Sequence, residues 1–231
     1  MAQTLALIHT SSIFLKMDTS LMALFSEIMP DVKLINILDD SLLAHCMAEE
    51  RISPAVMRRM CSYVVAAECT GADAALSLCS SLGPAIDVAR KLVTIPVIKI
   101  DDAHTEKAAQ LADRIGVMAT VGTTLGPTVA LIREKALALN KTVEVRQSLS
   151  TTAFHALMAG DRLRHDAMLI DAARELAPEV DLLLFAQASM TRLASEVEQA
   201  TGKPVLTSPR LAIEYTKRVM EGLKRKSASA D

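Results

Sequence analysis

Aromatic residues are scarce in this chain, which has no Trp, two Tyr and four Phe. Proteins that bind single-stranded nucleic acid stack successive bases on aromatic side chains, and the sequence offers few of them. Charge points the same way, because the net charge is −2 and both signs are scattered along the chain. The sequence therefore lacks the excess of basic residues that would bind a polyanion such as nucleic acid. We therefore expect no nucleic-acid partner.

Segments that would target or span a membrane are also missing. Residues 1–14 lack the basic start and the long apolar stretch of a secretory signal. The uncharged run 115–132 is as long as a membrane span, but it contains three glycines, one proline and four threonines. A strand, a polar loop and a helix start explain this run better. We expect a soluble, cytoplasmic protein without a membrane partner.

The four cysteines do not form a metal-binding pattern. None lies in a Cys-x-x-Cys pair, and no His stands at metal-ligand spacing from them. We expect no metal site, and reduced thiols as in most cytosolic proteins. Cys46, Cys61 and Cys69 fall on helical patterns, so we expect them to be buried apolar residues.

An internal duplication is the strongest pattern that is present. The segment GADAALSLCSS resembles EVDLLLFAQAS, and each is followed by an amphipathic stretch and a short apolar run. Cys79 precedes Pro96 by 17 positions, and Gln187 precedes Pro204 by 17. Further matches occur upstream in the same order, at offsets of 110 and 111 residues. The chain is therefore expected to contain two copies of one unit.

Strands and helices alternate within each copy. Short runs rich in Val, Ile and Leu read as buried strands, and longer stretches between them have helical periodicity. This predicts an α/β fold of two pseudo-symmetric doubly wound lobes, each with a four-stranded parallel sheet, and an active site in the interlobe cleft. We place the first lobe at 1–100 plus 207–231 and the second at 101–206. The predicted strands are 4–8, 32–38, 73–78, 96–100, 115–119, 143–147, 181–186 and 204–206.

Helix boundaries are marked by capping residues. In one helix Ser53 can act as N-cap, Pro54 suits the first turn, and Gly71 can end it. Two further helices are expected to start at Gly83-Pro84 and at Gly126-Pro127, with each proline in the first turn.

Ligands bind beyond the carboxyl ends of parallel strands, so the polar residues that follow each strand are the candidate site. All are small hydroxyl, thiol, imidazole or amide groups, and no Lys or Arg crowds these turns. Free backbone N–H groups of the helix starts would cradle a carboxylate there and favour the thiolate of a nearby cysteine. The candidates are His9, Thr10, Ser11, Ser12, Cys79, Ser80, Ser81, Thr120, Thr123, Thr124, Gln187 and Ser189.

The segments LALIHTSS, ADAALSLCSS, IPVIKIDDA, RIGVMATVGTT and VDLLLFAQAS resemble the aspartate/glutamate/hydantoin racemase superfamily, over nearly the whole chain to about residue 213. The resemblance implies a two-lobed α/β enzyme, commonly a homodimer, that needs no cofactor. It also implies a catalytic cysteine in each lobe on opposite faces of a carbon acid. Amino-acid racemases, hydantoin racemases, maleate isomerases and arylmalonate decarboxylases share this pattern.

The sequence departs from that pattern at one catalytic position. Cys79 matches the first-lobe cysteine, but Gln187 stands where the second is expected. An amide cannot usefully take or give a proton near neutral pH, so two-thiol racemisation is not expected. Three options stay open. Cys79 acts alone as acid or base, with Gln187 and Ser189 holding the substrate or an enolate oxygen; Cys79 adds as a nucleophile; or the reaction is a decarboxylation.

Taken together, these features predict a cofactor-independent isomerase or racemase-like enzyme that acts on a small carboxylate through Cys79. The alternatives are a decarboxylase-type lyase of the same superfamily and a non-catalytic binding protein for small acids. Cys79 and Gln187 are the expected catalytic pair. The expected substrate-binding residues are Ser11, Ser80, Ser81, Thr120, Thr123, Thr124 and Ser189.

Other polar residues have a simpler structural explanation. His45 and His155 occupy equivalent positions of the two copies, but they fall on helical stretches away from the strand ends. The segment 101–104, with two Asp and one His, reads as a solvated loop after the fourth strand. His9 lies nearer the site and is a candidate polar wall or proton shuttle.

Overall fold

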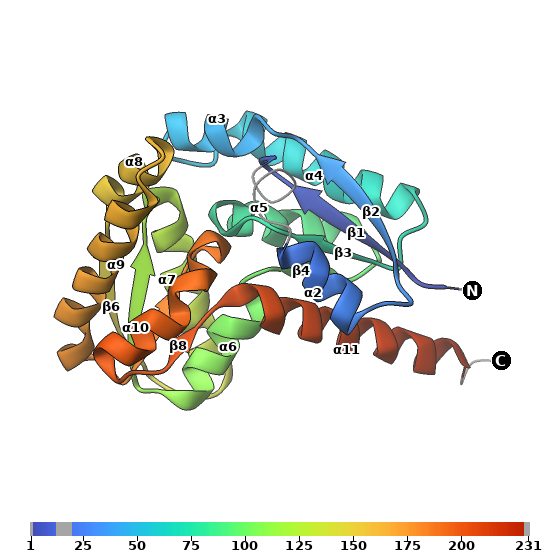
Figure 1. The fold of residues 1–231 in the computed structure, drawn as a ribbon. Coiled ribbons are helices and arrows are strands. Elements are labelled where there is room, and N and C mark those ends of the chain that lie inside the picture. The colour runs from blue at the N-terminus through green and yellow to red at the C-terminus, as the bar shows by residue number, and fades with distance from the viewer. Residues whose placement is uncertain (1, 13–19, 229–231) are drawn as a thin grey trace. The chain divides into compact units, whose positions relative to one another are not determined.

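The computed structural model describes residues 2–12 and 20–228, with side chains as far as 225. The chain divides into two compact units (Figure 1). The first unit comprises residues 1–100 and 209–231, and the second comprises residues 101–208.

A four-stranded parallel sheet forms the centre of the first unit, in the order β2-β1-β3-β4. Its strands are β1 (Thr4–His9), β2 (Lys33–Leu38), β3 (Ala74–Ser77) and β4 (Val97–Lys99). Its helical segments are α2 (Ser20–Ile28), α3 (Leu42–Ala48), α4 (Pro54–Cys69), η1 (Ser80–Leu82), α5 (Gly83–Ala89), η2 (Arg90–Leu92) and α11 (Ser208–Ala228).

The burial of these strands follows from their place in the sheet. Residues 5–8 of the inner strand β1 are 0% exposed, because helices cover both faces of the sheet there. The edge strand β2 alternates between exposed and half-buried residues. The last helix, α11, returns to this unit: Gln3 Nε2 donates to the carbonyl of Met220 at 2.9 Å, and Arg210 pairs with Glu27.

The expected capping of α4 is confirmed. The Ser53 hydroxyl accepts a hydrogen bond from the Val56 backbone N–H at 3.4 Å, and Pro54 is the first helical residue. Gly71 has φ +78° just beyond the helix, a conformation that favours glycine.

The second unit repeats the first. Its sheet is also four-stranded and parallel, in the equivalent order β6-β5-β7-β8. All eight strands expected from the sequence are present, so the predicted α/β fold of two doubly wound units is confirmed. The strands are β5 (Arg114–Ala119), β6 (Glu144–Leu149), β7 (Leu182–Phe185) and β8 (Val205–Leu206). The helical segments are α6 (Asp102–Leu111), α7 (Gly122–Ala138), α8 (Thr151–Met158), α9 (Arg162–Leu176), η3 (Ala177–Glu179), η4 (Ala188–Leu193) and α10 (Ala194–Thr201).

The two predicted proline starts have different outcomes. Pro84 lies in the first turn of α5, as expected. Pro127 lies inside α7, because this helix already begins at Gly122. A residue before proline avoids the helical region because its backbone N–H and its Cβ clash with the proline ring, and Gly126, which has no Cβ, lacks the second of these clashes. The dipeptide therefore marks a tolerated interior proline and not the start of the helix.

Candidate active site

In each sheet, the direction in which successive strands are added reverses between the two inner strands. In the first unit the chain moves outward from β1 to β2 on one side and from β3 to β4 on the other. In the second unit the same change occurs between β5 and β7. Such a switch point opens a crevice at the carboxyl ends of the two strands, where α/β proteins bind ligands. The residues that follow β1, β3, β5 and β7 are therefore the structural candidates.

Cys79 lies at the switch point of the first unit. The backbone N–H of Leu78 donates to the carbonyl of Ile8 at 3.0 Å, so pairing between β1 and β3 continues to the residue before the cysteine. Cys79 itself has extended backbone angles and is the N-cap of η1. It is 9% exposed and belongs to the core cluster that includes Leu82 and Ala85. The thiol thus sits at the boundary between the core and the strand ends.

The hydroxyl groups expected beside Cys79 lie on two adjacent segments. Ser80 and Ser81 form the start of η1, and Ser81 is 3% exposed. Ser11 follows β1, two residues beyond the end of the strand, and is half-buried. Since β1 and β3 are neighbours, these groups share one end of one sheet with the thiol.

His9 ends β1 and is held from the edge strand. It is 2% exposed, and its Nε2 lies 2.8 Å from Asn36 Oδ1 of β2. Burial lowers the pKa of His9, and the hydrogen bond with Asn36 opposes this only in part. The imidazole is therefore neutral near pH 7, and its Nδ1 has no hydrogen-bond partner among the described residues.

A network that the sequence analysis missed fixes the end of β2. The Asp39 carboxylate accepts hydrogen bonds from Tyr63 at 2.6 Å, from Ser41, and from Arg59. Burial alone would raise the pKa of Asp39, but these donors outweigh it and hold the pKa below its usual value. His45 of α3 lies beside this network and pairs with Glu49 at 2.7 Å, as a structural histidine would.

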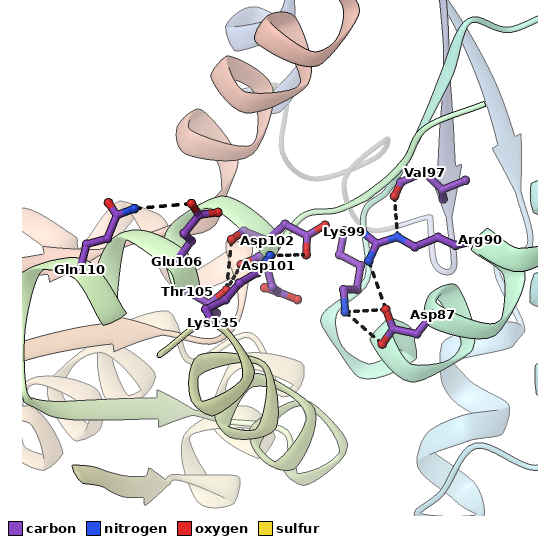
Figure 2. Close-up of polar contacts among 10 residues, drawn as sticks. All are labelled: Asp87, Arg90, Val97, Lys99, Asp101, Asp102, Thr105, Glu106, Gln110 and Lys135. Atoms are coloured by element: carbon purple, nitrogen blue, oxygen red, sulfur yellow. Dashed lines mark hydrogen bonds and ion pairs between the residues drawn. The ribbon is translucent and has the colours of Figure 1, made fainter. Parts of the chain in front are cut away.

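A buried lysine at the end of β4 is neutralised within its own unit. Lys99 is 5% exposed, and its Nζ donates to the two carboxylate oxygens of Asp87 of α5 at 2.8 and 3.0 Å (Figure 2). Arg90 donates from Nε to the carbonyl of Val97 at 2.7 Å. These contacts hold α5 and η2 against β4, and so fix the helical segment that follows Cys79.

Gln187 occupies the switch point of the second unit and contacts Thr120 directly. Its Oε1 lies 2.6 Å from the backbone N of Thr120, 3.1 Å from Thr120 Oγ1 and 3.1 Å from the backbone N of Val121. Gln187 follows β7 by two residues, and Thr120 follows β5 by one. The side chain therefore bridges the ends of the two inner strands.

The remaining candidates of the second unit lie in helical starts. Thr123 and Thr124 are in the first turn of α7, where Thr124 is 4% exposed and Thr123 is half-buried. Ser189 is exposed and lies in η4. His155 lies in α8 and is exposed.

The expectation of a solvated loop at 101–104 is wrong. Helix α6 begins at Asp102, and Asp101, Asp102 and His104 are 3%, 4% and 0% exposed. Figure 2 shows the hydroxyl of Thr105 donating to the carbonyls of Asp101 and Asp102, at 2.5 and 3.2 Å. The amino group of Lys135 lies 3.7 Å from Asp102 Oδ1. These three polar residues were expected to be exposed, because a pattern of charged residues in the sequence does not show which of them the fold buries.

His104 is expected to make the protein less stable in mild acid. Burial lowers its pKa to about 4, and the backbone of Asp101 and Phe185 opposes this too weakly to reverse it. The unfolded chain therefore binds this proton first, below pH about 6.5. From there down to about pH 4, the free energy of unfolding should fall by about 1.4 kcal/mol per pH unit because of this group.

Urea unfolding at several pH values would measure this slope. His104→Gln should remove that part of the pH dependence, whereas His155→Gln, at an exposed position, should keep it. Equal slopes for the wild type and His104→Gln would contradict the assignment.

The other cysteines lie on α3 and α4. Cys46 is buried and Cys61 is half-buried, and burial raises the pKa of both thiols. Cys69 is exposed, so the expectation that it is buried is wrong. It is the last residue of α4. None of the four cysteines, all within the described residues, forms a disulfide.

Two kinds of feature are absent from the part of the chain that the structure describes. No helix in this part of the chain is both long and apolar enough to span a membrane. No group of three or more His, Cys, Asp or Glu side chains is arranged there to hold a metal ion.

Comparison with known proteins gives one family match over most of the chain and several similar structures. Residues 16–216 match the family model described as Asp/Glu/Hydantoin racemase. No curated protein sequence matches at a significant level. Similar structures include the glutamate racemase isoform RacE1 from Bacillus anthracis, with a TM-score of 0.68 and 15% identity over 95% of this chain and 82% of that chain.

Two further structures represent other reactions on the same fold. Allantoin racemase from Klebsiella pneumoniae has a TM-score of 0.61 and 16% identity, over 97% of this chain and 89% of that chain. A glycine-to-cysteine variant of arylmalonate decarboxylase, in a sulfate-associated form, has a TM-score of 0.59 and 17% identity, over 95% of this chain and 94% of that chain. At these identities the likeness establishes the fold, not the reaction.

Proposed function

Because the chain belongs to the Asp/Glu/hydantoin racemase family, we propose that it is an isomerase or racemase-like enzyme that acts on a small carboxylate through Cys79. The observation that carries this proposal is the position of the thiol. Cys79 follows one inner strand of the first unit, at the switch point where α/β sheets bind ligands. The matching position of the second unit holds Gln187, so only one of the two positions carries a proton-transfer group.

In the proposed reaction the Cys79 thiolate removes the proton from the carbon next to the substrate carboxylate. The electron pair of the broken C–H bond moves onto the carboxylate oxygens, and the thiol later returns a proton to the carbon. Negative charge develops on oxygen, so hydrogen-bond donors near that oxygen stabilise the transition state. We assign carboxylate binding to Ser11, Ser80, Ser81, Thr120, Thr123 and Thr124, and we assign further substrate contacts to Gln187 and Ser189. The proposal also includes a cytoplasmic homodimer that uses no cofactor, as the family resemblance implies.

A lyase is the second candidate, favoured by the likeness to arylmalonate decarboxylase. Decarboxylation leaves a carbanion that needs a single proton donor, and Cys79 alone can supply it. A protein with one proton-transfer group fits this requirement. The non-enzymatic alternative is a binding protein for small acids, which fits the presence of an amide at position 187.

Incubation in deuterated water with a panel of carbon acids tests the function. We would use both enantiomers of aspartate and of glutamate, allantoin and phenylmalonate, and follow the products by NMR and mass spectrometry. We expect at least one acid to gain deuterium at the carbon next to its carbonyl group without losing carbon dioxide. Release of carbon dioxide together with deuterium uptake would identify the lyase instead. No change in any of these acids would contradict the enzyme assignment for these substrate classes.

A further inference from the structure

The amide of Gln187 has only one possible orientation. Two of its three neighbours are backbone N–H groups, of Thr120 and Val121, and these can only donate. The atom that faces them must therefore be the oxygen, whichever way the amide group is first placed. Because the oxygen points toward the end of β5, the NH₂ group of Gln187 points away from it.

The other end of the amide is available for a ligand. Nε2 donates no hydrogen bond to any of the residues that the structure describes, whereas Oε1 accepts three. The side chain is half-buried. The backbone of Gln187 is also fixed, because its carbonyl accepts the N–H of Met190 at 3.1 Å and the residue is the N-cap of η4. The two N–H bonds of Nε2 thus have a defined direction before any ligand arrives.

The environment of the oxygen makes this NH₂ group a stronger donor than an ordinary amide. An amide oxygen that accepts hydrogen bonds draws electrons from its nitrogen, so the N–H groups become more positive. Val121 is the N-cap of α7, a helix of 17 residues whose positive end adds to this polarisation. The NH₂ group of Gln187 therefore presents partial positive charge at a point one amide group beyond the N-terminus of α7.

We propose that Gln187 is a catalytic hydrogen-bond donor to the substrate oxygen that becomes negatively charged, and not a proton-transfer group. This inference rests on the proposed function. It defines the substrate class as a carbon acid whose acidifying group is a carboxylate or carbonyl, because deprotonation next to these groups places negative charge on an oxygen. It also changes the role of Thr120: its N–H and hydroxyl groups already bind Oε1, so Thr120 is a positioning residue that acts through Gln187.

The variant Gln187→Glu separates the two ends of the side chain. A carboxylate can keep all three hydrogen bonds at Oε1, but its second oxygen cannot donate. We expect kcat for deuterium exchange of the active acid to fall by about 10²-fold, as when one oxyanion donor is removed elsewhere, while urea unfolding is unchanged. Gln147→Glu, at an exposed position of β6 in the same sheet, is the matched control and should retain full activity. If Gln187→Glu keeps its activity within about threefold, the side chain only anchors the loop and the proposal is overturned.

An NMR titration tests the donor without needing turnover. In the ¹⁵N-labelled protein, the Nε2 signals of Gln187 are identified by their loss in Gln187→Glu. Malonate, a small dicarboxylate, should shift these signals and leave the backbone signals of Thr120 and Val121 in place. Large shifts at Thr120 and Val121 would mean that the carboxylate replaces Oε1, and no shift at saturating malonate would mean that Nε2 binds no oxyanion. Either result overturns the inference. A clear Nε2 shift in a protein that exchanges no carbon acid would instead contradict the proposed function alone.

Discussion

Replacing Cys79 by serine is expected to lower deuterium exchange of the active carbon acid by about 10⁴-fold. A positioned acid–base group contributes up to about this factor, and here no second proton-transfer group stands at the matching position of the other unit. A serine hydroxyl has nearly the same size but is far less acidic than a thiol, so the fold is kept while proton transfer is lost. Steady-state kinetics in deuterated water measure the change.

The control for this variant is Cys69→Ser. Cys69 is exposed at the end of α4, on the side of the amino end of β3 and not of the carboxyl ends, and its replacement should leave the exchange rate within about twofold. If Cys79→Ser retains most of the exchange, Cys79 is not the acid–base group and the proposed mechanism is wrong.

The rates at which iodoacetamide alkylates the individual cysteines distinguish an enzyme from a non-catalytic binding protein. A catalytic Cys79 should react faster than the exposed Cys69 near neutral pH, and an active acid should slow it. Cys46 should react slowest, since it is 1% exposed and burial raises its pKa. Equally slow reaction of Cys79 and Cys46 would favour the non-catalytic rival.

Replacing Gln187 by cysteine is expected to speed racemisation relative to deuterium exchange. With one thiol, the proton mostly leaves and returns on the same face of the carbon, so an optically pure acid should gain deuterium faster than it loses its configuration. A second thiol at position 187 supplies a proton-transfer group at the matching switch point. We expect the racemisation rate to rise by about 10³-fold, within the range for general acid–base catalysis.

Chiral chromatography and deuterium NMR on the same samples give the ratio of racemisation to exchange. The double variant Cys79→Ser/Gln187→Cys should lose the gain, because the faster racemisation needs both thiols. Gln187→Cys leaves the N–H groups of Thr120 and Val121 without their acceptor, which costs about 1–3 kcal/mol, so its urea unfolding must be measured alongside. A folded variant that exchanges with full retention of configuration would contradict the one-sided mechanism.

The fold was largely predictable because its signals are periodic and repeated. The inner strands are short and mostly apolar, and each strand of the first unit has a counterpart in the second at a nearly constant offset. Capping by Ser53 is a local effect of a side chain on its own helix, so the sequence reveals it. Pro127 was misplaced because the same dipeptide is compatible with a first turn and with a helix interior, and only the preceding residues decide between them.

The candidate site was less predictable because its contacts join distant residues. The sequence indicates that Gln187 replaces a thiol, but not that Thr120 and Val121 fix its orientation from 67 and 66 positions away. The hydrogen bonds of Asp39 could not be predicted for the same reason, since Arg59 and Tyr63 contact it from α4. The exposure of a side chain also depends on residues that are distant in sequence. Cys69 was expected in the core but is exposed, and His104 was expected in a solvated loop but is buried.

The return of α11 to the first unit has a consequence for the order of assembly on the ribosome. Residues 101–208 emerge as one continuous stretch, so this unit has its whole sequence available while the chain is still growing. The first unit has its four strands early, yet Gln3 and Glu27 must wait for Met220 and Arg210. The half of the molecule that is made first is therefore the half that is completed last.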